Sequence, residues 1–179
     1  MSERVEGTES SAINRAVWLA MLLKRRGNLA GARELLDRPK LLGIGYNRGF
    51  VLEALCDLLA VQGAWDEARE TLAEAREHAD LAGLLALPAY ADRLEGRLWV
   101  AEGDFPRALE LLDRARSVLS SLGAAWEAAC TGLDLAATLA GVDDRDGARE
   151  QLSAAVPTLK RLRSADELAE AERLRNQLA

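Results

Sequence analysis

One turn motif recurs along the chain at nearly constant spacing, and this repeat limits the fold more than any other feature. It begins at Gly27, Gly63, Gly103 and Asp143, so that successive anchors differ in sequence number by 36, 40 and 40. An alanine follows each of these anchors by five residues and a leucine by nine, and a small residue precedes each anchor by seven. The pattern predicts helical hairpins, because a left-handed glycine ends a helix and small residues let two helices approach closely. The alanines are Ala32, Ala68, Ala108 and Ala148, and the leucines are Leu36, Leu72, Leu112 and Leu152.

The amino-acid composition also favours helices over strands. The chain of 179 residues has 33 alanines and 33 leucines, whereas valine, isoleucine and threonine together number 15. Alanine and leucine are strong helix formers, and strands are enriched in β-branched residues. A hairpin cannot bury its apolar face alone, so successive hairpins have to stack. We therefore expect an all-α fold, an α–α superhelix, and exclude folds that need a large sheet.

Apolar periodicity and the turn anchors together predict nine helices. Residues 1–10 are polar and acidic, and we expect them to form a disordered tail ahead of a helical repeat domain at 11–163. The predicted helices cover about 11–26, 29–38, 47–62, 65–82, 88–102, 105–121, 124–140, 146–162 and 164–178.

The end of the chain, residues 164–179, is expected to form a capping helix that seals the stack. Ser164 and Glu167 have the spacing of a capping box at its start. An apolar stripe among charged residues follows, and it comprises Leu168, Ala171, Leu174 and Leu178.

The segments GDFPRA at 103–108 and GAWDEA at 63–68 resemble the tetratricopeptide repeat (TPR) family. The resemblance covers roughly 14–156, although Leu29 and Arg145 stand where the family has an aromatic residue. The longer spacing is similar to the long-helix variant in bacterial regulators. The resemblance implies a solenoid of about four hairpins, whose first helices line a concave groove that binds a partner.

Mapping outward from the anchors predicts which side chains line this groove. Glu53 and Asp57 occupy the repeat positions that Arg93 and Arg97 occupy one repeat later, so we expect the two pairs to face each other across neighbouring helices. They are interpreted either as interhelical ion pairs or as a polar floor that holds a charged peptide or ligand. The predicted groove residues are Val17, Met21, Lys24, Phe50, Glu53, Asp57, Tyr90, Arg93, Arg97 and Leu133.

Catalytic and metal-binding constellations are missing from the sequence. It has one histidine, His78, and two cysteines, Cys56 and Cys130, which are interpreted as free buried thiols. We therefore expect no catalytic residue, no cofactor and no metal. The net charge of −6 argues against nucleic acid as a partner, and no apolar run approaches the length of a membrane span. A cytoplasmic location is expected.

The sequence thus predicts a non-enzymatic scaffold that binds a protein or peptide through its groove. One alternative is a ligand-sensing or regulatory domain that encloses a small molecule or signal peptide around Met21, Phe50 and Tyr90. Another is a homo-oligomerisation module, such as a homodimer, with Trp18 or Trp126 shielded at an end face.

Overall fold

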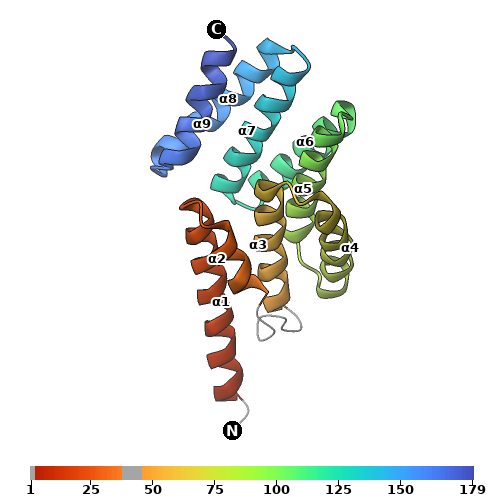
Figure 1. The fold of residues 1–179 in the computed structure, drawn as a ribbon, viewed down its shortest axis with the longest axis vertical. Coiled ribbons are helices and arrows are strands. Elements are labelled where there is room, and N and C mark those ends of the chain that lie inside the picture. Colours follow the sequence, from red (N-terminus) through yellow and green to blue (C-terminus); the bar gives the residue numbers. More distant parts are fainter. Residues whose placement is uncertain (1–2, 38–45) are drawn as a thin grey trace. The chain divides into compact units, whose positions relative to one another are not determined.

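The computed structural model describes residues 3–37 and 46–179, and their regular secondary structure is entirely helical (Figure 1). The predicted all-α class is therefore confirmed. Apart from the start of the first helix, the observed ends differ from the predicted ones by at most two residues. The helices in the described part of the chain are α1 (Glu3–Arg25), α2 (Leu29–Leu36), α3 (Tyr46–Gln62), α4 (Trp65–Ala82), α5 (Leu87–Glu102), α6 (Phe105–Ser121), α7 (Ala125–Gly141), α8 (Arg145–Arg161) and α9 (Ala165–Gln177).

The first helix begins earlier than expected. A disordered tail was predicted over residues 1–10, but α1 starts at Glu3, and only residues 1–2 of that segment lie outside the described residues. The prediction rested on polarity alone. Since the stretch from Glu3 to Arg25 contains no proline, nothing in it blocks the backward extension of a helix that packing has already nucleated.

The turns between helices share one backbone geometry, which confirms the predicted anchors. Gly27, Gly63 and Gly103 have φ values of 75°, 65° and 82°, and Asp143 takes the same left-handed conformation at 61°. After each of them, the next backbone N–H donates to the carbonyl five residues earlier, as from Asp104 to Trp99 at 2.9 Å. This is the Schellman type of helix end. Three further turns have it too, at Gly83, Gly123 and Arg163, so that from Gly63 every twentieth residue is left-handed.

The helix starts are capped in two ways. Asn28, Asp104 and Asp144 are N-cap residues whose side-chain oxygens accept a hydrogen bond from the backbone three residues later. Ser164 is the N-cap of α9, but its side chain makes no capping hydrogen bond, so the part of the capping box predicted for Ser164 is wrong. The buried Ser164 continues the turn through its backbone instead, since its N–H donates to the Leu159 carbonyl at 3.0 Å.

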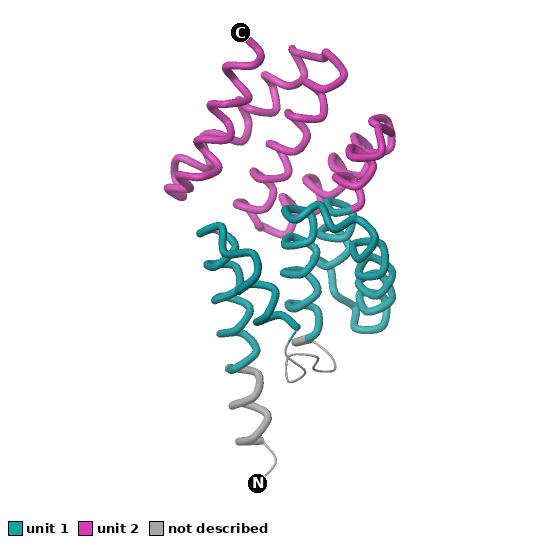
Figure 2. The backbone as a smooth tube through the Cα atoms, viewed as in Figure 1, with its two compact units in different colours: residues 1–94 teal, residues 95–179 magenta. Residues whose placement is uncertain are grey.

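Two compact units make up the chain, residues 1–94 and 95–179, and their boundary falls inside α5 (Figure 2). In the first unit, α1 packs against α2 and α3, and α3 packs against α4. The small residues predicted for close packing are buried there, as Ala20 and Ala32 show with exposures of 2% and 1%. The surrounding apolar core includes Ile13, Val17, Leu35, Leu36, Val51, Leu55 and Leu58.

In the second unit, α7 packs against α6, α8 and α9. The apolar stripe predicted for α9 is confirmed, because Ala171, Leu174 and Leu178 are buried in the core that α7 and α8 share with it. The close helix packing predicted at the small residue of α5, Gly96, is confirmed as well. A Cβ built on Gly96 would lie 2.8 Å from Leu112 Cγ and 3.3 Å from the Ala108 carbonyl oxygen, so α5 and α6 approach closely at this point.

Candidate functional site

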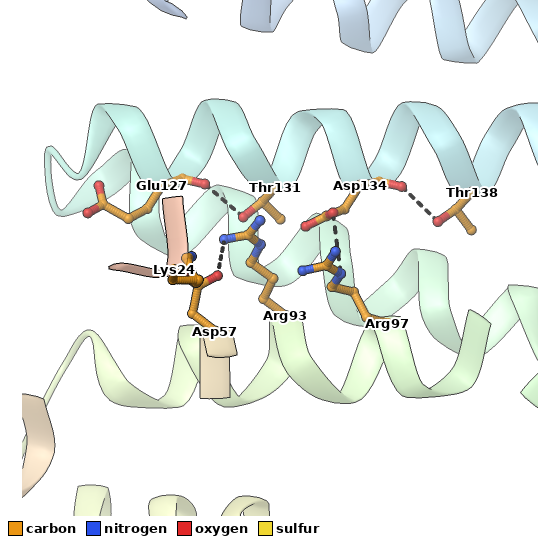
Figure 3. Close-up of polar contacts among 8 residues, drawn as sticks. All are labelled: Lys24, Asp57, Arg93, Arg97, Glu127, Thr131, Asp134 and Thr138. Carbon is orange, nitrogen blue, oxygen red and sulfur yellow. Dashed lines mark hydrogen bonds and ion pairs between the residues drawn. The ribbon is translucent and has the colours of Figure 1, made fainter. Parts of the chain in front are cut away.

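Charged side chains from three helices of the first unit meet at Asp57. Asp57 lies on α3, and its carboxylate pairs with the Lys24 ammonium of α1. Its other oxygen lies 3.7 Å from Arg93 Nη1 of α5 (Figure 3). The three side chains are between 12% and 14% exposed, so they are largely shielded from solvent. The sequence analysis expected Glu53 and Asp57 to face Arg93 and Arg97, and the structure shows one contact between these two groups, Asp57–Arg93.

Helix periodicity brings further predicted residues to the same place. On α3, Phe50 and Glu53 precede Asp57 by seven and four residues, which puts the three on one helix face. Tyr90 stands three residues before Arg93 on α5 in the same way. Phe50 and Tyr90 are half-buried, and so is Met21 on α1. We call this set the Asp57 face, and it comprises Met21, Lys24, Phe50, Glu53, Asp57, Tyr90 and Arg93.

The register of the pairs differs from the prediction. Equivalent positions in successive repeats differ in sequence number by 36 or 40, but the observed pairs Lys24–Asp57, Asp57–Arg93 and Arg97–Asp134 differ by 33, 36 and 37. Each separation is one helical turn shorter than the repeat, since helix faces recur every three or four residues. A side chain on the first helix of one hairpin therefore contacts the first helix of the next hairpin about one helical turn before its equivalent position in the repeat.

This offset corrects the prediction for Arg97. It was expected to face the acidic residues of α3, but within the second unit its guanidinium lies 3.5 Å from Asp134 of α7 (Figure 3). The sequence analysis did not select Asp134. A count from Arg97 that stops one helical turn short of the repeat spacing of 40 residues reaches Asp134, so the sequence could have indicated this pair.

Two predicted groove residues are core residues. Val17 is 8% exposed in the core of the first unit, and Leu133 is 6% exposed in the core of the second. Their apolar side chains contribute to stability by leaving water, and a partner could not reach them without opening the core. The prediction that they line a groove surface is wrong. It was made from their positions in the repeat, and these positions do not tell which side chains point into the core.

The environment of Asp57 also affects Cys56. This thiol is 1% exposed, and burial raises its pKa to about 12, with the negative charges of Asp57 and Glu53 adding to the effect. A thiol with so high a pKa stays protonated near neutral pH and is a poor nucleophile. Cys130 is buried too, and both cysteines are free, as predicted. The geometry therefore gives Cys56 a packing role.

Several buried polar groups escaped the sequence analysis. Thr131 and Thr138 on α7 are 0% and 3% exposed, and each hydroxyl donates to the carbonyl four residues earlier at 2.8 Å (Figure 3). Asp92 on α5 is 4% exposed and accepts a hydrogen bond of 2.9 Å from Arg76 of α4. No motif marks these residues, because an isolated threonine or aspartate in a helix looks like a surface residue.

A cleft of about 210 Å³ opens in the second unit among α6, α7 and α8. Small side chains line most of it. Two buried polar atoms of lining residues, Arg116 Nε and Gln151 Oε1, have no hydrogen-bond partner in the described part of the chain. The cleft is not the pocket expected for a ligand sensor, since none of Met21, Phe50 and Tyr90 lines it. Its lining also includes Ser120, Ala125, Ala129, Gly132, Ala155 and Thr158.

Within residues 3–37 and 46–179, no group of three or more histidine, cysteine or acidic side chains is arranged to hold a metal ion. His78 is half-buried on α4. Over the same residues, none of the helices has the length and apolarity needed to cross a bilayer.

Comparison with known proteins gives one family. The model of the Suppressor of spindle checkpoint defect 1 C-terminal domain matches residues 19–176, which is most of the chain. No TPR family model matches, so the expected TPR membership is wrong, and so is the bacterial variant, because the matched family is eukaryotic. Small residues at helix contacts and glycine at turns are favoured in any stack of antiparallel helices, so the motif reports packing and not ancestry. No curated protein matches the chain.

Proposed function

The chain belongs to the family of the Suppressor of spindle checkpoint defect 1 C-terminal domain, and we propose that it is a non-enzymatic helical scaffold that binds a protein or peptide partner. The observation that carries the proposal is the convergence of α1, α3 and α5 on Asp57. This convergence puts charged and half-buried aromatic side chains on one composite surface. The family's name refers to a suppressor of a spindle checkpoint defect, which is a phenotype and not a chemical activity.

We propose that the hairpins stack in series as an α–α solenoid. Contacts between consecutive first helices support this arrangement in each unit. In the first unit α1 packs on α3, and Asp57 joins α3 to α5. In the second unit Asp134 joins α7 to Arg97 of α5, and α7 packs against α9. A stack of this kind leaves the faces of the first helices to form an extended surface, which suits the binding of a peptide or a helix.

The Asp57 face has the composition of a recognition surface. Phe50 and Tyr90 offer apolar area with little conformational entropy left to lose, since both are already half-buried. The ion pairs fix Lys24 and Arg93 in place. Charged groups held in this way contribute to specificity more than to affinity, because they reject partners of the wrong charge. We therefore expect a partner segment that combines an apolar anchor with a charged group.

An inversion of the charges tests this function. The triple variant Lys24→Glu, Asp57→Lys and Arg93→Glu keeps the attraction within the cluster but reverses the charge that the face presents. Wild-type protein and the variant are used in parallel as bait in cell lysate, after thermal unfolding shows that both are folded. A protein that the wild type retains and the variant loses supports the proposal. Equal capture by both proteins would locate the contact elsewhere.

A second candidate, ligand sensing, is favoured by the cleft in the second unit. Arg116 Nε can donate a hydrogen bond and Gln151 Oε1 can accept one, a combination that suits an amide group of a small ligand. A thermal-shift screen of small polar metabolites tests it. A ligand should raise the melting temperature of the wild type and leave that of Ala125→Phe unchanged, because the larger side chain would fill the cleft.

Two other expectations stay predictions. Self-association is checked by sedimentation over a range of protein concentrations, and the cytoplasmic location by fractionation of cells.

A further inference from the structure

The cleft among α6, α7 and α8 exists because small residues stand where larger side chains would fill it. On α7 the lining residues Ala125, Ala128, Ala129 and Gly132 recur every three or four residues, so they lie on one face of the helix. This face leaves space between α6 and α8, which each pack against α7. The cleft of about 210 Å³ has the volume of about seven water molecules at about 30 Å³ each. It therefore suits a compact ligand, since pockets for drug-sized molecules measure about 300–1,000 Å³.

Two polar groups of opposite kind stand on the two outer helices of the cleft. Arg116 is on α6 and Gln151 is on α8, and Arg116 Nε and Gln151 Oε1 are both buried with no hydrogen-bond partner in the described part of the chain. A buried polar atom without a partner costs free energy, so a ligand that bonds to it is favoured. Both side chains are long and only partly buried, so a change of rotamer can turn these atoms towards a ligand.

The cleft offers a ligand little net charge. The Arg116 guanidinium is paired with Asp113, one turn earlier on α6, since its Nη2 donates to Asp113 Oδ1 at 2.9 Å. The other side chains that line the cleft are uncharged. A carboxylate would gain little from a guanidinium that already has a counter-ion, and its oxygens would face Gln151 Oε1, which is also an acceptor. The cleft therefore favours a neutral group that both accepts and donates.

We propose that this cleft binds a small neutral molecule through a primary carboxamide group. The carbonyl oxygen of the ligand accepts from Arg116 Nε and its NH₂ group donates to Gln151 Oε1, so both unpaired atoms gain partners. The alanines of the lining contact the apolar body of the ligand. This inference rests on the ligand-sensing function proposed for the cleft, and it adds the chemical class of the ligand. It is independent of the Asp57 face.

Three probes that share one aromatic body test the proposal: benzamide, benzoate and N,N-dimethylbenzamide. Benzoate has the shape of benzamide but carries a charge and cannot donate, and the dimethyl compound is neutral but cannot donate. Each probe is titrated into the isotope-labelled full chain, and the backbone NMR signals of Gly123 and Gly132, which line the cleft, report binding. We expect benzamide to bind about tenfold more tightly than either analogue, because a site that hydrogen-bonds one group rejects analogues that lack it.

Two variants test the groups that select the ligand. Gln151→Met removes the acceptor at similar side-chain length, so it should weaken benzamide binding by about fivefold and should not weaken benzoate binding. Asp113→Asn removes the counter-ion of Arg116 and should shift the preference towards benzoate by about threefold. The control is Gln177→Met, which changes an exposed glutamine of α9 outside the cleft and should bind the probes as the wild type does.

Three results would overturn the proposal. They are equal affinity for benzamide and benzoate, unchanged benzamide binding by Gln151→Met, and no response of the cleft signals to any probe. Equal binding of all three probes that Ala125→Phe abolishes would refute only the carboxamide class and would leave the ligand-sensing function standing. A metabolite screen without any stabilising ligand would refute that function itself. Circular dichroism shows whether each variant remains folded, and Asp113→Asn, at a side chain that is 64% exposed, gives a reading even if Gln151→Met unfolds.

Discussion

The Arg93 guanidinium lies 3.7 Å from the Asp57 carboxylate, and this pair ties α5 to α3. Both side chains are largely shielded from water, so the attraction is screened less than at an open surface. Lys24 pairs with the same carboxylate, which leaves the group of three with one anion between two cations.

Replacing Arg93 with glutamate should destabilise the first unit by about 1–3 kcal/mol. The change sets a second carboxylate against Asp57 where an attraction stood, at a site with little access to water. Urea unfolding measures the loss. The control is Arg93→Met, which removes the attraction without adding repulsion and should cost less. If both variants unfold at the wild-type urea concentration, the pair makes no contribution to stability.

Gly96 should tolerate no side chain. Its built Cβ lies 2.8 Å from Leu112 Cγ, so Gly96→Leu has to push α5 and α6 apart, at a cost of about 1–3 kcal/mol or more. Gly132→Ala is the matched control, because a Cβ there would meet Ala155 Cβ at 3.4 Å, which is ordinary contact. That change should be neutral or stabilise by up to about 1 kcal/mol, since alanine favours helix. The measurement is the melting temperature of each variant. Equal changes in melting temperature for the two variants would contradict the close approach of α5 and α6 at Gly96.

Glycine should improve the turn at Arg163. The residue has φ of 54°, a conformation that costs a non-glycine residue about 1–2 kcal/mol. Arg163→Gly removes this strain but makes the unfolded chain more flexible, so we expect a net gain of about 0.5–1 kcal/mol. The reverse change at a matched turn, Gly123→Ala at φ of 74°, should lose a similar amount. A stabilised Gly123→Ala variant would mean that the left-handed turns are not retained in solution.

The Cys56 thiol should make the fold sensitive to alkali. Its pKa is raised from 9.0 to about 12 in the folded protein, mainly by burial. Above pH 9 the unfolded chain loses the proton that the folded chain still holds, so the unfolded state is favoured and stability falls between about pH 9 and pH 12. Below pH 9 this group has no effect on stability. The measurement is the midpoint of urea unfolding at several pH values, with Cys56→Ala as control. The variant should lose less stability over this range, and parallel curves for the two proteins would refute the linkage.

The sequence predicted the hairpins well because their signals are local. A glycine or aspartate that ends a helix in the left-handed conformation, and an alanine that faces the next backbone, act through neighbours a few residues away. Gly83 and Gly123 each stand midway between two anchors that had been recognised, so the same reasoning could have found the turns between hairpins. The turn at Arg163 has no such sequence signal, because arginine is not a residue that favours positive φ.

The candidate site was less predictable, since it depends on distances between elements. The repeat aligned equivalent residues correctly, but the contacts Asp57–Arg93 and Arg97–Asp134 fall one turn short of that alignment. This difference of one turn arises because neighbouring helices are offset along their axes. The sequence of a single helix does not show the offset. For the same reason, the sequence analysis did not predict that the side chains of Val17 and Leu133 are buried in the core. The family was missed because residues that satisfy packing carry little information about descent.

The left-handed residues at every twentieth position, from Gly63 to Arg163, make the chain modular in length. If residues 104–143 were removed, Gly103 would be followed directly by Asp144, and the join would again pair a left-handed glycine with an aspartate that caps the next helix. Gain or loss of a whole repeat therefore leaves the turn chemistry intact. Loss of a single residue within a helix would instead rotate every later side chain by about 100°. In such a chain whole repeats are the natural unit of variation, and single-residue insertions or deletions between Gly63 and Arg163 should be rare among its relatives.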